Sequence, residues 1–81
     1  MITGYQIRAA RSFLRWSAEE AASRVGVTKK TIERLEQHEG VPSTRAQTLL
    51  GLQRAFEAAG IEFVGTPEEG PGVRLWRDRA K

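Results

Sequence analysis

The chain has no cysteine and one histidine, His38. Without thiols it cannot form a disulfide framework or a thiolate zinc site, and a single histidine cannot build a metal site. No apolar run approaches the ~18 residues that cross a bilayer, and the N-terminus lacks the charged and apolar regions of a targeting segment. We therefore expect a cytoplasmic protein without metal or other cofactor.

The chain also lacks the residue patterns of an active site. No nucleophile has a base at a recognisable spacing, and the adjacent acids Glu19 and Glu20 are better explained by the start of a helix. An enzyme is therefore not expected.

The composition is that of one small globular domain. The 81 residues are 40% hydrophobic and 28% charged, with mixed signs, which argues against disorder. A net charge of +3 and a pI near 10.0 favour a polyanionic partner, although many small basic proteins bind none. Whether a polyanionic partner is expected therefore depends on how the charges are arranged along the chain.

The segment from Ala18 to Gln37 organises the chain. Its apolar residues recur at helical spacing on both sides of Gly26, which can end a helix with a positive φ. The pattern, which includes Ala21 and Ala22, predicts two helices joined by a tight turn. Ala22 lets the helix backbones approach, and Val25, Val27, Ile32 and Leu35 fill the angle between them. The second of these helices keeps a short, polar and cationic outer face.

Capping residues set the expected limits of these helices. Ser17 and Glu20 have the spacing of a capping box at the start of the first, and Thr28 caps the second. The second helix should fray near His38 or Glu39, before Gly40 and Pro42.

Two further helices are predicted on either side of this segment. One runs from about Thr3 to Arg15, with Trp16 after it as a plug for a corner of the core. The other follows Ser43, stops at Gly60 and contains Gly51, which we interpret as a close contact between backbones. Their predicted apolar stripes are Ile7, Ala10, Phe13 and Leu14 in the first, and Ala46, Leu49, Leu50, Leu52, Ala55, Phe56 and Ala59 in the second.

After Gly60 the apolar pattern alternates, which predicts a β-hairpin with strands at 61–64 and 73–76. The predicted fold is therefore mainly α: a helical bundle over 1–60, a short C-terminal hairpin over 61–76 and a tail over 77–81. An isolated hairpin is marginally stable, so it packs on the helices or crosses a subunit boundary. Its residues for a possible dimer interface are Ile61, Phe63, Leu75 and Trp76.

The segment RSFLRWSAEEAASRVGVTKKTIERLE, residues 11–36, resembles the helix-turn-helix of the Xre/Cro family, to which the phage lambda repressor belongs. The resemblance implies a lambda-repressor-like bundle with a recognition helix after Gly26. It also implies that Arg11 of the first helix pairs with Glu36. The alternative is two unrelated surface charges.

The resemblance also implies the contacts with DNA. The positions that read bases fall on Lys29, Lys30 and Arg34, with Thr28 and Thr31 near a phosphate or a thymine methyl group. Lysine and arginine match guanine in the major groove, although the two lysines could instead touch phosphate. Where relatives carry a phosphate-binding glutamine this chain has Ala18, so other anion contacts are expected at Ser17, Thr44 and Arg45.

The function implied is a sequence-specific, double-stranded DNA-binding transcriptional regulator, such as a repressor. It would act as a homodimer that reads an inverted repeat. The alternative is an antitoxin or anti-activator that binds another protein through the hairpin, with Phe63, Leu75 and Trp76 as apolar anchors. For these three residues, packing on the fourth helix is the competing interpretation.

Overall fold

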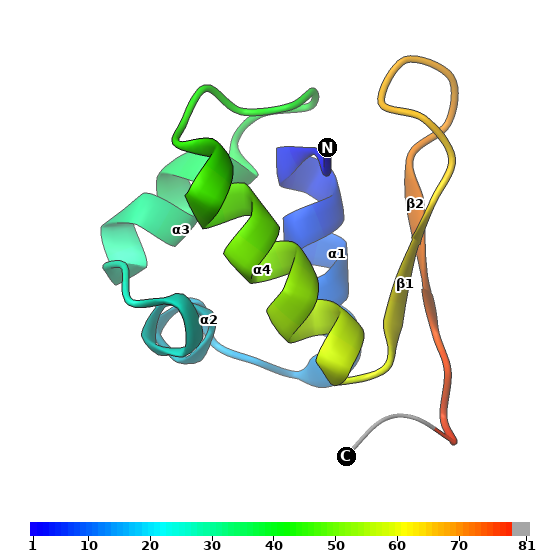
Figure 1. The fold of residues 1–81 in the computed structure, drawn as a ribbon, viewed down its shortest axis with the longest axis horizontal. Coiled ribbons are helices and arrows are strands. Elements are labelled where there is room, and N and C mark those ends of the chain that lie inside the picture. The colour runs from blue at the N-terminus through cyan, green and yellow to red at the C-terminus, as the bar shows by residue number, and fades with distance from the viewer. Residues whose placement is uncertain (79–81) are drawn as a thin grey trace.

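Four helices precede a two-stranded antiparallel hairpin (Figure 1). The computed structural model describes residues 1–78; the last three residues of the predicted tail lie outside the described part. The elements are α1 (Gly4–Leu14), α2 (Ala18–Val25), α3 (Lys29–Glu36), α4 (Ala46–Ala58), β1 (Ile61–Val64) and β2 (Gly72–Leu75). Within 1–78, no helix combines the length and the apolar content needed to cross a membrane. The predicted mainly helical fold with a terminal hairpin is confirmed.

Local signals explain the path from α2 to α3. The Ser17 hydroxyl accepts from the amide of Glu20, and the Thr28 hydroxyl accepts from the amide of Thr31. Gly26 ends α2 with a φ of 74°, as predicted. The predicted reciprocal half of the Ser17 box is wrong, because the Glu20 carboxylate pairs instead with Arg24, 3.1 Å away.

Other element ends differ slightly from the prediction. Helix α3 ends at Glu36 rather than near His38, because the next two amides bond three residues back and tighten the last turn. Helix α4 begins at Ala46 after Arg45, which makes no side-chain capping bond. Strand β2 begins and ends one residue earlier than expected, so Trp76 follows the strand.

The core lies between the four helices and one face of the hairpin. Its fully buried side chains include Ile7, Ile32, Leu35, Leu49, Leu52 and Phe56. Three residues assigned to apolar stripes are exposed instead of buried: Ala46, the first residue of α4, Phe13, which is 51% exposed, and Leu50, which is 42% exposed. Phe13 and Leu50 each lie at the edge of their stripe, since neighbouring helical residues are rotated by about 100°.

Trp16 fills a corner of the core, as predicted. Its ring stacks on Phe56 with the centroids 5.2 Å apart, and the Arg24 guanidinium covers its other side at 3.9 Å. The indole is therefore held between an aromatic ring and a cation.

Helix α1 is tied to two distant segments at its first turn. Thr3 and Gln6 form a capping box, and the Gln6 side-chain amide also donates to the carbonyl oxygens of Gly72 (2.9 Å) and Val64 (3.3 Å). On another side, Gly4 lies so close to α3 that a Cβ atom would overlap with the Leu35 and His38 carbonyl oxygens.

The hairpin lies on α1 and α4 (Figure 1). Ile61 pairs with Leu75 and Phe63 with Val73, while Glu62 pairs with Arg74. Ile61 is 3% exposed, and the Phe63 ring meets Phe56 edge-on at 6.0 Å. One face of the hairpin is therefore part of the core.

Candidate nucleic-acid interface

Helix α3 has two chemically different faces. Ile32, Leu35 and Glu36 are buried against the rest of the molecule. Lys29, Lys30 and Arg34 are exposed. The core therefore fixes the orientation of the helix and leaves its cations on the surface.

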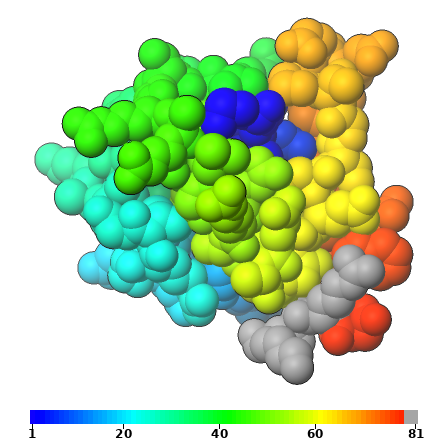
Figure 2. Space-filling view, viewed as in Figure 1, coloured from blue at the N-terminus to red at the C-terminus, as the bar shows by residue number. Residues whose placement is uncertain are grey.

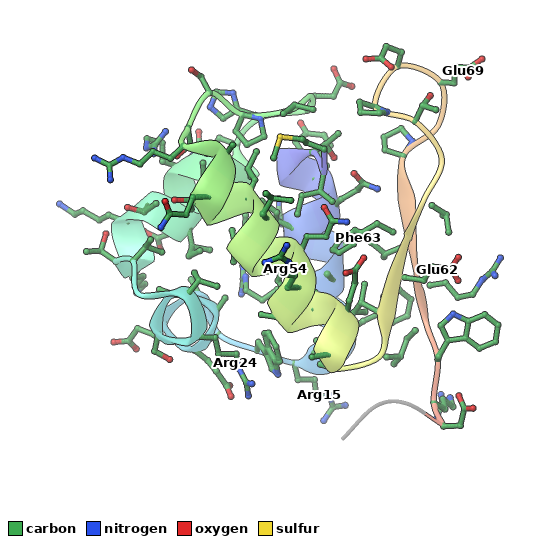
Figure 3. All side chains as sticks on the ribbon, viewed as in Figure 1. Arg15, Arg24, Arg54, Glu62, Phe63 and Glu69 are labelled. Atoms are coloured by element: carbon green, nitrogen blue, oxygen red, sulfur yellow. The ribbon has the colours of Figure 1, made fainter. Side chains whose placement is uncertain are left out.

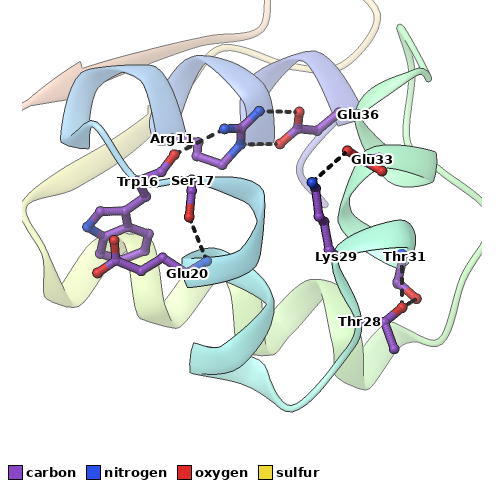
Figure 4. A network of polar contacts seen from close by, with 9 residues as sticks. All are labelled: Arg11, Trp16, Ser17, Glu20, Thr28, Lys29, Thr31, Glu33 and Glu36. Atoms are coloured by element: carbon purple, nitrogen blue, oxygen red, sulfur yellow. Dashed lines mark hydrogen bonds and ion pairs between the residues drawn. The ribbon is translucent and has the colours of Figure 1, made fainter.

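Arg11 and Glu36 fasten α3 to α1 (Figure 4). Arg11 Nε lies 2.7 Å from Glu36 Oε2, and its Nη2 lies 2.8 Å from Oε1. The third nitrogen, Nη1, donates to the Trp16 carbonyl oxygen at 3.0 Å. The hydrogen bonds to Glu36 raise the pKa of Arg11, against the opposite effect of its partial burial. This two-pronged geometry is stronger than a single surface ion pair.

The two threonines at the start of α3 bind each other. Thr28 Oγ1 and Thr31 Oγ1 lie 3.1 Å apart, and Thr28 Oγ1 also accepts from the Thr31 amide. Thr28 is exposed, whereas Thr31 is half-buried. Thr28 is thus the more accessible of the two, and Thr31 can present mainly its methyl group.

The three cations of α3 differ in how they are held. Lys30 has no hydrogen bond or ion pair within residues 1–78. Arg34 Nη1 lies 3.5 Å from the Ser43 carbonyl oxygen, a long hydrogen bond. Lys29 Nζ lies 4.0 Å from the exposed Glu33 carboxylate (Figure 4), which neutralises part of its charge. Lys30 and Arg34 are therefore the cations that an incoming anion meets most directly.

The remaining predicted phosphate contacts lie at the starts of other helices. Arg34 reaches the loop before α4, which continues into the half-buried Thr44 and the exposed Arg45. Ser17 is the N-cap of α2 and follows Trp16, whose carbonyl oxygen accepts from Arg11. It is exposed, but its hydroxyl already caps α2. Of these residues, the Thr44–Arg45 segment is tied to α3 most directly, through the Arg34 contact with Ser43.

Sequence reasoning missed Glu33, an acid on the candidate DNA face. The signal was available, because Lys29 and Glu33 are four residues apart on one helix, the usual spacing of a helical ion pair. It also missed the exposed Arg54 of α4, because this segment was interpreted only from its apolar residues.

The hairpin residues proposed for dimerisation mostly face their own molecule. Ile61 is buried, and Phe63 and Leu75 pack against the core. Trp76 is half-buried on the other face, where its Nε1 donates to Glu62 at 2.7 Å and its ring lies 5.4 Å from the Arg74 guanidinium. Ile61 in particular is not available as a contact surface.

Comparisons with known proteins give no match, either to a protein-family model or to a curated protein. The geometry and charge of α3 and its surroundings therefore carry the functional argument.

Proposed function

We propose that the protein is a sequence-specific, double-stranded DNA-binding transcriptional regulator. In this proposal the fold is of the lambda-repressor-like helix-turn-helix type, and α3 is the recognition helix. The turn at Gly26 and the placement of α3 by its buried face support this proposal.

The observation that carries the proposal is the cationic outer face of α3. Lys30 and Arg34 are exposed one helical turn apart, on a helix whose other side is held by Ile32, Leu35 and the Arg11–Glu36 pair. A rigid helix with exposed cations fits the major groove, where such side chains bind guanine O6 and N7. The preferred half-site therefore contains guanine.

Flanking groups would fix the position of α3 on the duplex. Arg45 and Thr44 lie on the α4 side, and Ser17 and Thr28 lie at the starts of α2 and α3. Contacts of this kind go to phosphates and orient the protein without reading sequence. As a homodimer, the protein would place two recognition helices about 34 Å apart on an inverted repeat.

The test is an in vitro selection from random duplexes, followed by binding titrations on the selected site. We expect guanine-containing half-sites and an affinity that falls steeply with salt, because phosphate contacts release counterions. Arg34→Ala should weaken binding to the selected site by about tenfold or more, since one good base contact is worth roughly 1–3 kcal/mol.

The matched control is Arg77→Ala, which removes an exposed arginine far along the chain from α3. It should change affinity far less than Arg34→Ala. If both variants lose affinity equally, or if selection returns no preferred sequence, the assignment of α3 as a recognition helix is wrong.

The alternative, protein binding through the hairpin, has less support. Its proposed anchors Phe63 and Leu75 pack on the core of their own molecule, and the Trp76 indole is bound to Glu62. The hairpin therefore offers little free apolar surface at these positions.

A further inference from the structure

An open groove with three arginines lies between the end of α2 and the first half of α4. We call it the arginine groove; its volume is about 580 Å³ and its cations are Arg24, Arg45 and Arg54. Arg24 is already paired with Glu20, whereas Arg45 and Arg54 have no hydrogen bond or ion pair within residues 1–78. The groove therefore has uncompensated positive charge.

The lining of the arginine groove is also partly apolar. Val25 and Val27 contribute from the α2–α3 turn, and Leu50 contributes from α4 although it is 42% exposed. The phosphate groups of a nucleic-acid backbone have no apolar part to cover such a residue. This mixture suits a protein segment that carries both acidic and apolar groups.

Gly51 lines the arginine groove without contributing a side chain. A Cβ atom there would lie 3.6 Å from Val25 Cγ1, an ordinary van der Waals distance. The packing of α2 on α4 therefore does not require a glycine in the middle of α4, where it costs about 1 kcal/mol relative to alanine.

The chain itself contains a segment of the required chemistry. The loop between the strands, the hairpin tip, runs over residues 65–71 and carries the exposed acids Glu68 and Glu69 beside Pro67 and Pro71. A hollow beside the tip adds Glu39 and has no basic residue among its described lining. Figure 2 shows the tip projecting at one corner of the molecule.

The hairpin tip and the arginine groove of one copy do not meet. No tip residue lines the groove among the described residues. In Figure 3, Arg24 and Arg54 lie over α2 and α4, whereas Glu69 lies at the far end of the hairpin. Any pairing between these two surfaces must therefore join different molecules.

We propose that the arginine groove of one copy receives the acidic hairpin tip of a second copy. Because each copy has one groove and one tip, two copies can form both contacts in a twofold dimer. Glu68 and Glu69 would face Arg54, and the prolines would cover Leu50. This inference deepens the proposed function, on which it rests, by naming the surfaces that join the two copies.

The test measures self-association without DNA, by sedimentation equilibrium, so that it can fail while DNA binding by α3 stands. The wild type should dimerise, with an affinity that falls as salt is added. Arg54→Glu and Glu68→Arg each place like charges in both contacts and should weaken self-association by at least about tenfold.

Mixing the two variants gives the sharpest result. In a mixed pair, the reversed groove of Arg54→Glu faces the reversed tip of Glu68→Arg, while the other contact remains wild-type. The equimolar mixture should therefore regain dimerisation that neither variant shows alone. Circular dichroism checks that both variants are folded, as expected for exposed residues.

Matched controls reverse similar charges elsewhere. Arg77→Glu and Glu57→Arg, both at exposed positions, should leave self-association within about twofold of the wild type. A monomeric wild type, reversals that leave the dimer intact, or a mixture that stays monomeric would each overturn the proposal. The proposal would also be overturned if Phe13→Glu, a change at an exposed residue, abolished the dimer while Arg54→Glu retained it.

Discussion

Two pairs of helices cross in this molecule with a glycine at the contact, and the two contacts differ. At the α1–α3 contact, Gly4 leaves no room for a Cβ atom beside the Leu35 and His38 carbonyl groups. At the α2–α4 contact, Gly51 leaves ordinary van der Waals space beside Val25. The first glycine is required by packing within the chain, whereas the second is not.

The difference matters because α3 belongs to the tight contact. Backbone contact at Gly4 and the Arg11–Glu36 ion pair hold α3 on α1, which fixes the helix that carries Lys30 and Arg34. The α2–α4 contact instead opens into the arginine groove. The α1–α3 contact thus fixes the position of the cationic face of α3, whereas the α2–α4 contact leaves the arginine groove open.

The largest expected effect is at Gly4. Gly4→Ala forces α1 away from α3, because the new methyl group would overlap with backbone atoms that cannot rotate aside. We expect a loss of about 3 kcal/mol in the free energy of unfolding, measured by urea denaturation. Gly40→Ala is the control, since a Cβ there meets nothing within 4 Å. Equal losses in both variants would show that the α1–α3 contact is looser than described.

The next largest effect is expected at the Arg11–Glu36 ion pair. Glu36→Ala leaves the partly buried Arg11 guanidinium without its carboxylate and should lower the free energy of unfolding by about 1–3 kcal/mol. Glu33→Ala removes an exposed acid from the same helix and should change it by less than about 0.5 kcal/mol. A Glu36→Ala loss no larger than that of Glu33→Ala would mean that the ion pair does not fasten α3.

The Arg11 contribution should not depend on pH near neutrality. Hydrogen bonding to Glu36 raises the pKa of Arg11 in the folded state, so its stabilisation is fully present below the unfolded pKa and is lost only as pH rises through the folded pKa. Both values lie in the strongly alkaline range. The stability difference between wild type and Glu36→Ala should therefore be the same at about pH 7 and about pH 9.

The smallest expected effect is that of Gly51→Ala, which should raise the free energy of unfolding instead of lowering it. Gly51→Ala removes a helix-weakening residue without a clash, so the free energy of unfolding should rise by about 0.5–1 kcal/mol. Thermal unfolding at a concentration where the protein is monomeric measures this. A loss of stability would show that α2 and α4 are as tightly packed as α1 and α3.

Residues with local roles could be predicted from the sequence. Ser17, Thr28 and Gly26 begin or end helices through bonds to their own neighbours, so their chemistry alone indicates their place. The resemblance to a known family supplied the Arg11–Glu36 pair, which joins residues 25 positions apart.

Residues whose role depends on tertiary contacts were harder to predict. Gly4 was passed over because its neighbour is the end of α3, and Gly51 was singled out only because it interrupts a helix. Phe13 and Leu50 are apolar but exposed, since hydrophobicity gives a preference for the core and not a direction toward it. The arginine groove brings together cations from two helices, and no regular spacing along the chain predicts it.

The side chain of Gln6 connects both ends of the described chain. Its oxygen accepts from the Thr3 amide, while its nitrogen donates to carbonyl groups on both strands of the hairpin. Fraying of the first residues therefore removes these two hydrogen bonds from the hairpin, while Ile61 and Phe63 still hold it on the core. One polar side chain thus links the first turn of α1 to the end of the hairpin next to its loop.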